Sequence, residues 1–460
     1  MSKLPPLSLA VKLAYGAGEL AAAVPASLSA FFVLYFFTTV AGLSPALAGG
    51  VILVGRLWDA INDPLIGGLS DRTVSPWGRR FPWMLGGVGP MALCSLLLWT
   101  VPPFSGQWAI FTYYAVLSFF AFIAFTAVQL PYTALAAELS PDYDERTTLI
   151  GLKAAFGIGG GILALVLAQG VFAWVADPRR QYLILGGVSA VLAVLMVGLC
   201  VAGTYRRYWQ VEKRRPPGSP AQVPLWRDLA SVFHNYAFRQ VLGLYFCAWM
   251  AVQVTAAMLP YFVGNWMGLP AFHFAQMALA VQGTAMLLLG VWHRLARHSD
   301  KRTVFLLGAP LAMVALFGLG LVQPGQIGWM YGLAIVAGMG VATLYMMPFA
   351  MLPDVVDLDE LQTGQRREGL YFSALVFLQK LGLALALFVS GQVLSWTGFI
   401  AQASSQPPSA LWAIRLLIGP LPGLLLLLSL IFAYRYPISR DRHRQILTAL
   451  AQKQERPENP

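Results

Sequence analysis

Long uncharged apolar runs restrict the possible folds of this chain more than any other feature of its sequence. Residues 81–137, 240–293 and 303–353 contain no Asp, Glu, Lys or Arg, and each run is long enough for about two membrane spans of ~20 residues. Charged residues make up 11% of the chain, compared with about 25% in an average soluble domain. The sequence therefore predicts an all-α integral membrane protein that crosses the bilayer many times.

Polar and Pro/Gly-rich joints divide the apolar runs into twelve predicted transmembrane helices. Their ranges are 12–40, 45–71, 81–101, 107–137, 149–175, 181–205, 237–263, 271–294, 303–322, 327–352, 369–398 and 411–435. The longest polar connection splits them into two sets of six. We predict an N-terminal six-helix bundle (1–205), a basic cytoplasmic linker on the lipid headgroups (206–236), a C-terminal six-helix bundle (237–435) and a cytoplasmic tail (436–460).

The basic residues indicate the orientation of the chain in the membrane. Most of the 31 Lys and Arg residues fall in alternate connections and at the two ends, and cytoplasmic loops are the ones enriched in these residues. The net charge of +11 thus reflects the orientation of the chain in the membrane, and we expect no nucleic-acid partner. We expect both termini in the cytoplasm, a location in the plasma (inner) membrane, and retention of the first span because no cleavable signal sequence is visible.

Short repeated strings relate the two halves. "LSDRT" at residues 69–73 is echoed by "HSDKRT" at 298–303, and "LPYTAL" at 130–135 is echoed by "MPFAML" at 347–352. Many secondary transporters are built from repeated units, with the substrate site between them near the middle of the bilayer. The repeats favour this class of protein.

Five charged residues that lie well inside predicted spans have the largest bearing on the fold: Glu19, Arg56, Asp59, Asp63 and Lys380. On insertion scales, an Asp, Lys or Arg at the centre of a span is unfavourable by about 2.5 to 3.5 kcal/mol. We therefore expect all five side chains to face a polar interior instead of lipid.

Asp59 and Asp63 are one helical turn apart, so both carboxylates lie on the same side of the second span. Pro64 follows directly, and a proline inside a helix leaves the carbonyl four residues earlier, that of Ala60, without its usual partner. These oxygens, with the Asn62 amide, suit a small cation. The alternative is that Arg56 pairs with Asp59 and the group only holds two helices together.

The remaining charges suggest switching or binding roles. Lys380 is either a competitor for the cation or one half of a static ion pair with the carboxylates of the second span. Glu19 either accepts hydrogen bonds from substrate hydroxyls or is a static partner of Lys380 or Lys153. Asp71, next to Arg72 and before "WGRR", belongs to a structural and gating loop.

Several function classes lack their sequence signatures. No G-x-x-x-x-G-K motif is present, which excludes a P-loop pump on this chain. The five histidines are scattered, the three cysteines lack metal-ligand spacing, and no nucleophile with a convergent base is visible. We expect no enzyme, no cofactor and no metal other than a coupling cation.

Four strings carry a resemblance to a known family. "RLWDAINDPLIGGLSDRT", "WGRRFPW", "LPYTALAAELSPDYDERT" and "LQKLG" are similar to the glycoside-pentoside-hexuronide:cation symporters, the melibiose-type branch of the major facilitator superfamily. The resemblance implies the twelve-helix major facilitator fold. It also implies that Asp59, Asp63 and Thr126 bind Na⁺, Li⁺ or H⁺, and that Lys380 and Glu19 match the family's span 11 lysine and its sugar-binding carboxylate.

The chain departs from the melibiose type at the expected sugar site. Gln129 replaces an aspartate, Thr133 replaces the tryptophan that stacks on the sugar ring, and Lys153 replaces an arginine, which keeps the charge but loses the planar fork. "QLPYTAL" also resembles the animal sodium-coupled lysophosphatidylcholine symporters, whose pocket admits an amphipathic lipid. Gln129 fits a lysophospholipid symporter better than a sugar symporter.

The sequence thus predicts a Na⁺- or H⁺-coupled symporter of a sugar or glycoside that works by alternating access. The alternative is a symporter of a lysophospholipid or another amphipathic solute. The predicted cation site comprises Asp59, Asp63, Thr126 and Asn62. The predicted substrate site comprises Glu19, Gln129, Lys153, Tyr132 and Thr133. The predicted coupling and gating residues are Lys380, Arg56, Asp71 and Arg146. We expect the partners to be a small solute, a monovalent cation and membrane lipid, and the protein to be a monomer.

Overall fold

Helices form all the regular structure in the described part of the chain. The computed structural model describes residues 5–140, 142–212, 232–365, 367–403 and 405–455. Residues group into two compact units. Unit 1 comprises Met1–Ala221, Pro270–Gln276 and Leu387–Pro407, and unit 2 comprises Gln222–Leu269, Met277–Ala386 and Pro408–Pro460.

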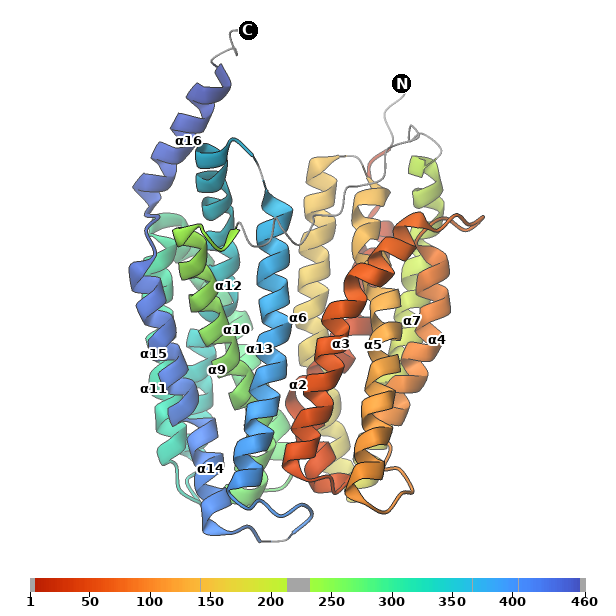
Figure 1. Cartoon of the computed structure of the whole chain (residues 1–460), viewed down its shortest axis with the longest axis vertical. Helices are drawn as coiled ribbons and strands as arrows, with labels where there is room; N and C mark the ends of the chain where they lie inside the picture. The colour runs from red at the N-terminus through yellow and green to blue at the C-terminus, as the bar shows by residue number, and fades with distance from the viewer. Residues whose placement is uncertain (1–4, 141, 213–231, 366, 404, 456–460) are drawn as a thin grey trace. The chain divides into compact units, whose positions relative to one another are not determined.

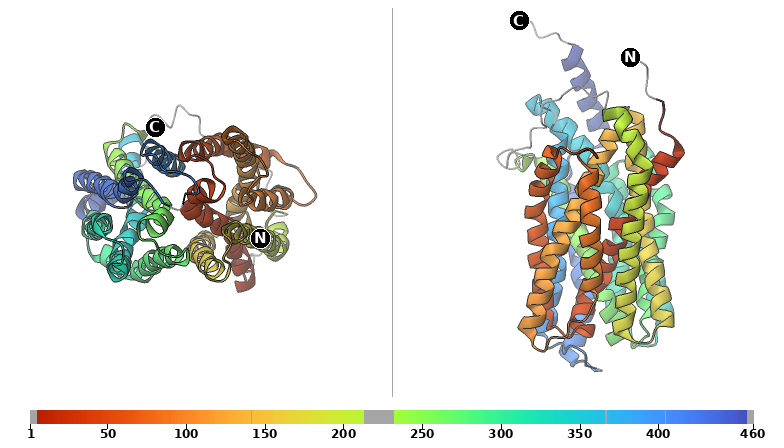
Figure 2. Two further views of the ribbon diagram at one scale, coloured as in Figure 1. Left: turned by 90° about the horizontal axis from the view of Figure 1, so that it is seen from below. Right: turned by 90° about the vertical axis from the view of Figure 1, so that its right-hand side faces the viewer.

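The N-terminal helices all belong to unit 1 (Figure 1). They are α1 (Leu9–Ala17), α2 (Leu20–Tyr35), the π-helical turn η1 (Phe36–Val40), α3 (Pro45–Arg72), α4 (Phe81–Leu98), α5 (Gln107–Leu139), α6 (Tyr143–Trp174) and α7 (Pro178–Glu212). Helices α4, α5, α6 and α7 run alongside one another in the right-hand view of Figure 2.

The C-terminal helices belong mainly to unit 2, except that the start of α10 and the end of α13 belong to unit 1. They are α9 (Tyr236–Tyr261), the π-helical turn η2 (Phe262–Trp266), α10 (Phe272–His298), α11 (Lys301–Leu321), α12 (Ile327–Thr363), α13 (Glu368–Trp396), α14 (Pro408–Ile418), α15 (Pro420–Arg435) and α16 (Arg440–Glu455). Within unit 2, α11 packs against α12 and α15 packs against α9.

Eleven helical segments of the described chain are long and apolar enough to cross a membrane. The twelfth predicted span is α3, which is 28 residues long but less apolar because it carries Arg56, Asp59 and Asp63. The prediction of an all-α membrane protein with twelve spans is confirmed.

Two predicted spans are broken instead of continuous. The first consists of α1, α2 and η1, and the last consists of α14 and α15, which are separated at Gly419. A Cβ at Gly18 would lie 2.6 Å from the Tyr132 ring, and one at Gly419 would lie 2.5 Å from the Leu316 carbonyl oxygen. Both breaks therefore fall where a neighbouring helix approaches closely, which hydropathy alone does not reveal.

The first long helix of each sequence half ends in the same backbone device. After η1, the Ala41 and Leu43 amides donate to the carbonyls of Phe36 and Phe37, and Gly42 has a φ of 77°. After η2, the Met267 and Leu269 amides donate to the carbonyls of Phe262 and Val263, and Gly268 has a φ of 67°. Positive φ values of this size favour glycine, so "AGL" and "MGL" have equivalent roles.

The predicted cytoplasmic segments are described only in part. Residues 213–231, most of the predicted linker, lie outside the described residues, as do residues 456–460 of the tail. Helix α7 continues to Glu212, past the predicted end of the sixth span. The tail forms α16, where His443 lies 3.0 Å from Asp357 of α12.

Candidate functional site

Two carboxylates of α3 meet one hydroxyl of α5. The Thr126 hydroxyl lies 3.1 Å from Asp63 Oδ1 and 3.4 Å from Asp59 Oδ1. Asp59 and Thr126 are each 1% exposed, whereas Asp63 is half-buried. We call Asp59, Asp63 and Thr126 the carboxylate cluster; it brings together three of the four predicted cation ligands.

Small and polar residues hold α3 against α5 at this level. Gly55 lies so close to α5 that a Cβ there would be 2.9 Å from the Phe122 ring and 3.2 Å from Ser118 Cβ. The Asn62 amide donates to the Phe122 carbonyl at 3.2 Å. The fourth predicted ligand, Asn62, therefore has a helix-joining contact beside the cluster. Pro64 lies inside α3 without ending it.

Arg56 lies next to the carboxylate cluster without closing on it. Its guanidinium is 3.8 Å from Asp59 Oδ2 and lies 5.0 Å from the centre of the Phe122 ring. The predicted ion pair is thus present but loose, and the cation–π contact with Phe122 holds the guanidinium to one side. Arg56 carries one positive charge and the two ionised carboxylates carry two negative charges, so the three groups together have a net charge of −1.

A monovalent cation suits this charge and these ligands. Carboxylate and hydroxyl oxygens are hard ligands of the kind that small hard cations prefer. Among the described residues, no group of three or more His, Cys, Asp or Glu side chains is arranged to hold a metal ion. The cluster can offer two carboxylates and one hydroxyl to a single small ion.

A second polar group joins the turn between α1 and α2 to α5 and α6. The Gln129 amide donates to Glu19 Oε2 at 3.2 Å, and Lys153 Nζ lies 3.8 Å from the same carboxylate oxygen. Lys153 also donates to the Thr133 hydroxyl at 2.7 Å. We call Glu19, Gln129, Lys153 and Thr133 the polar patch. The side chains of Glu19 and Lys153 are 16% and 22% exposed, so they are accessible to a solute.

Tyr132 occupies a different position from the one predicted for a substrate ligand. Its side chain is fully buried, its hydroxyl donates to the Tyr15 carbonyl at 3.0 Å, and its ring stacks on that of Tyr15. Lys153 Nζ lies 5.4 Å from the centre of the Tyr132 ring. Tyr132 therefore packs beside Lys153. Because its side chain is fully buried, it is not placed to contact a solute directly, contrary to the prediction.

The predicted gating loop is tied to α5 by a buried acid that sequence reasoning missed. Arg80 pairs with Asp71 and donates from Nε to Glu138 at 3.0 Å, while Arg79 reaches the same Glu138 oxygen at 3.1 Å. Glu138 is 5% exposed. In the sequence Glu138 lies near the end of a span, where an acidic residue usually faces water. Its only signal was that it belongs to "LPYTALAAELSPDYDERT", one of the strings that carry the family resemblance.

Unit 2 contains a corresponding ion pair. Lys301 Nζ, at the start of α11, lies 2.7 Å from Asp354 of α12. Lys301 belongs to "HSDKRT", which echoes the "LSDRT" that contains Asp71, and α12 contains "MPFAML", which echoes the "LPYTAL" of α5. The repeat therefore extends from sequence to side-chain contacts.

The two other predicted coupling residues lie elsewhere. Arg146 of α6 donates to the Ser140 carbonyl at 2.6 Å and to the Ala137 carbonyl at 3.3 Å, so it caps the end of α5. Lys380 lies on the part of α13 that belongs to unit 2. Its role as a switch for the cation stays a prediction.

Comparison with known proteins matches a family model, described as MFS/sugar transport protein, to residues 14–440. The match covers all the predicted spans except the first two residues of the first. The chain belongs to this MFS/sugar transport family.

One relative in the family is an uncharacterized symporter of Synechocystis sp., which is 41% identical to this chain over 98% of both chains. Another is the human sodium-dependent lysophosphatidylcholine symporter 1, which is 26% identical over 96% of this chain and 88% of its own length. Among solved structures, a D-xylose-proton symporter matches with a TM-score of 0.67 and 13% identity, covering 93% of this chain and 98% of its own.

These likenesses establish the class of the protein. Family membership makes the chain an integral membrane transporter of the major facilitator superfamily and not an enzyme. The structural match shows the shared major facilitator fold. Within that fold, the carboxylate cluster and the polar patch both lie inside unit 1 and share α5.

Proposed function

We propose that this MFS transporter is a Na⁺- or H⁺-coupled symporter that moves a small polar solute, a sugar or glycoside, by alternating access. The observation that carries the proposal is the convergence of Asp59, Asp63 and the Thr126 hydroxyl within hydrogen-bonding range. Two ionised carboxylates one helical turn apart repel each other unless a cation lies between them or one is protonated. A mobile cation supplies that compensation in each transport cycle.

The polar patch is the proposed solute site. Glu19 and Gln129 offer oxygens to sugar hydroxyls, and the Lys153 ammonium offers a donor beside them. Thr126 and Gln129 are three residues apart and so lie on one face of α5. Cation and solute therefore bind to adjacent turns of one helix, which gives a direct physical link between the two ligands.

Coupling follows from this link. A cation that neutralises the carboxylate cluster stabilises the arrangement of α3 and α5 that positions Gln129. Each ligand then raises the affinity of the transporter for the other, and by linkage the two factors are equal. For Lys380 we propose a role in switching cation binding during the cycle.

The membrane arrangement is also part of the proposal. The basic connections support cytoplasmic termini and a plasma (inner) membrane location, and we propose that the transporter acts as a monomer. Its motif strings support the glycoside-pentoside-hexuronide:cation branch.

A second candidate solute is an amphipathic lipid. Gln129 and Thr133 replace the aspartate and tryptophan expected of a melibiose-type carrier, and a relative of this chain is a sodium-dependent lysophosphatidylcholine symporter. In that case the polar patch would bind the headgroup.

Transport assays in proteoliposomes test the proposal and separate the two solutes. An inward Na⁺ gradient is expected to drive accumulation of a tracer glycoside in a panel that includes melibiose, and the same vesicles are tested with lysophosphatidylcholine. Asp59→Asn and Asp63→Asn are expected to abolish accumulation. Asp177→Asn is the matched control, because this carboxylate is 49% exposed and its contacts in the described structure are exposed Arg180 and the Arg179 amide, which an Asn oxygen can still accept from.

Lysolipid uptake without sugar uptake would favour the second candidate. Accumulation that survives both cluster substitutions, in folded and inserted protein, would refute the cation site. Driving by a pH gradient in the absence of Na⁺ would assign H⁺ as the coupling ion.

A further inference from the structure

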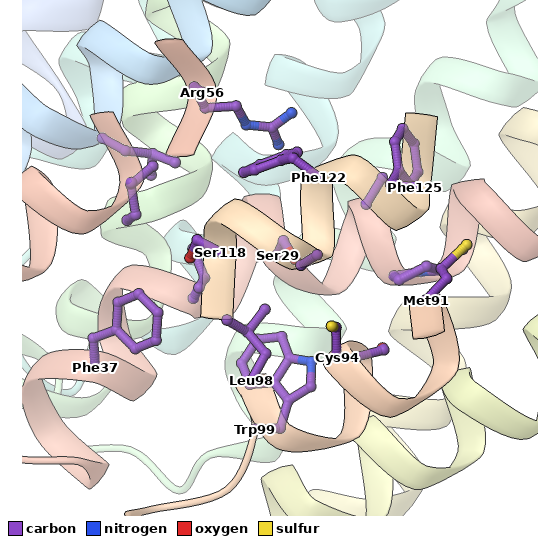
Figure 3. A pocket seen from close by; sticks show the side chains of 17 residues that line it. Ser29, Phe37, Arg56, Met91, Cys94, Leu98, Trp99, Ser118, Phe122 and Phe125 are labelled. Atoms are coloured by element: carbon purple, nitrogen blue, oxygen red, sulfur yellow. The ribbon is translucent and has the colours of Figure 1, made fainter. Parts of the chain in front are cut away.

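A cavity of about 130 Å³ lies mainly among α2, α3, α4 and α5 of unit 1, with Phe37 of η1 and Leu387 of α13 also in its wall (Figure 3). Its wall is mainly apolar and includes Ile52, Met91, Trp99 and Phe125. None of the four residues of the polar patch lines it, and neither do Asp59, Asp63 and Thr126. The proposed transport function therefore leaves this cavity unused.

Arg56 is the charged residue in the cavity wall. Figure 3 shows its guanidinium at the edge of the cavity, above the Phe122 ring. A guanidinium has five N–H donors. Among the described residues, the one ion-pair contact of Arg56 is Asp59 at 3.8 Å, which is longer than a hydrogen bond. The guanidinium can therefore donate to a further anionic group that enters the cavity.

The hydroxyls of Ser29 and Ser118 add polar groups to the same wall. Ser118 lies one turn from Phe122 on α5, so this hydroxyl and the guanidinium border a common region. Hydroxyls and a guanidinium together favour an acceptor with two oxygens, such as a carboxylate.

The remaining space limits the size of the ligand. An apolar cavity of about 150 Å³ takes up benzene, so a cavity of similar size accommodates a six-membered ring or a short alkyl chain. The rings of Phe37, Trp99, Phe122 and Phe125 line it and offer faces and edges for aromatic contacts.

We propose that this cavity binds a small monoanionic ligand with an apolar body, an aryl or short-chain alkyl carboxylate, whose carboxylate pairs with Arg56. The apolar body lies among the aromatic side chains, and the Ser29 and Ser118 hydroxyls complete the polar end. A neutral analogue of the same shape leaves the guanidinium without its acceptor.

Binding at this site has a consequence for the carboxylate cluster, and this consequence rests on the proposed symport function. A carboxylate that pairs with Arg56 removes positive charge from beside Asp59. The cluster then gains affinity for a cation, so the ligand and Na⁺ raise each other's affinity. The proposal thus describes a modulatory anion site that acts through one shared arginine.

Equilibrium binding of radiolabelled benzoate to the purified full chain in detergent, at pH 7.5, tests the site. We expect saturable binding, and at least about tenfold weaker competition by benzyl alcohol than by unlabelled benzoate. Ala121→Leu fills the cavity from α5 and Arg56→Gln removes the charge, and each is expected to weaken binding at least about tenfold. Val116→Leu is the control, because this side chain of α5 is 50% exposed and does not line the cavity.

Thermal unfolding and size-exclusion profiles establish whether each variant is folded. If Ala121→Leu does not fold, Ser29→Leu is used instead, because it fills the cavity from α2. Absence of saturable benzoate binding, or equal binding by a folded cavity-filling variant, would overturn the proposal. Because this assay needs no transport and no Na⁺, its failure is distinct from failure of the symport function. Addition of Na⁺ is then expected to tighten benzoate binding in the wild type and not in Asp59→Asn.

Discussion

The Thr126 hydroxyl of α5 lies 3.1 Å from one oxygen of Asp63 and 3.4 Å from one oxygen of Asp59. A hydroxyl has a single proton, so it can donate to only one carboxylate at a time, whereas its oxygen has two lone pairs. A cation between the carboxylates requires this proton to turn away and the oxygen to face the ion. Thr126 can therefore serve the empty cluster as a donor and the occupied cluster as a ligand.

Replacement of Thr126 by valine is expected to weaken Na⁺ binding about tenfold, because the isosteric side chain lacks the oxygen. Thr126→Ser keeps the hydroxyl and is expected to stay close to the wild-type affinity. Binding of ²²Na⁺ to purified protein measures both effects. Equal affinity of the valine and serine variants would show that the hydroxyl is not a ligand.

Replacement of Gly55 by alanine is expected to push α3 away from α5, since its Cβ would lie 2.9 Å from the Phe122 ring. Overpacking of this kind destabilises proteins by about 1 to 3 kcal/mol. A lower unfolding temperature and weaker Na⁺ binding should appear together. Gly68→Ala on the same helix is the control, because nothing lies within 4 Å of a Cβ there; a similar loss in both variants would point to a helix-wide effect.

Lys153→Met is expected to reduce solute uptake strongly while it leaves Na⁺ binding in the absence of solute unchanged. The substitution removes the ammonium that lies 3.8 Å from Glu19 and 2.7 Å from Thr133. Lys153→Arg keeps the charge and should retain part of the uptake. The decisive measurement is the Michaelis constant for the solute, and an unchanged value in Lys153→Met would remove this residue from the solute site.

Glu138→Gln is expected to destabilise the transporter, because two arginines share this buried carboxylate. Loss of one partner of a buried ion pair is unfavourable by about 3 kcal/mol or more. Asp177→Asn disrupts an exposed pair, which is worth about 1 kcal/mol or less. Thermal unfolding of the two variants compares them, and equal unfolding temperatures would mean that the network has no net stabilising effect.

Much of the fold could be predicted because hydropathy and charge act locally. The apolar runs specify twelve spans, and the spacing of Asp59 and Asp63 places both on one face of α3. The breaks at Gly18 and Gly419 are not visible in the hydropathy of the chain, because both lie inside predicted spans. Each coincides with the close approach of a neighbouring helix.

The site was less accessible to sequence reasoning for the same reason. No local pattern links Thr126 to the carboxylates; only the resemblance to known symporters indicated it, because the contact joins α3 to α5. Glu138 looked like an ordinary charge at a span end, and Tyr132 looked available to a solute although Gly18 and Tyr15 enclose it. Which residues face one another across helices is decided by packing.

The paired π-turns η1 and η2 restrict changes in the length of the chain. Each inserts extra backbone into the last turn of a helix and is followed by a left-handed glycine, Gly42 or Gly268. Deletion of one residue there would rotate everything beyond it by about 100° around the helix axis, so neither segment readily tolerates a change in length. These two glycines are therefore equivalent positions at which the two halves of the sequence can be superposed.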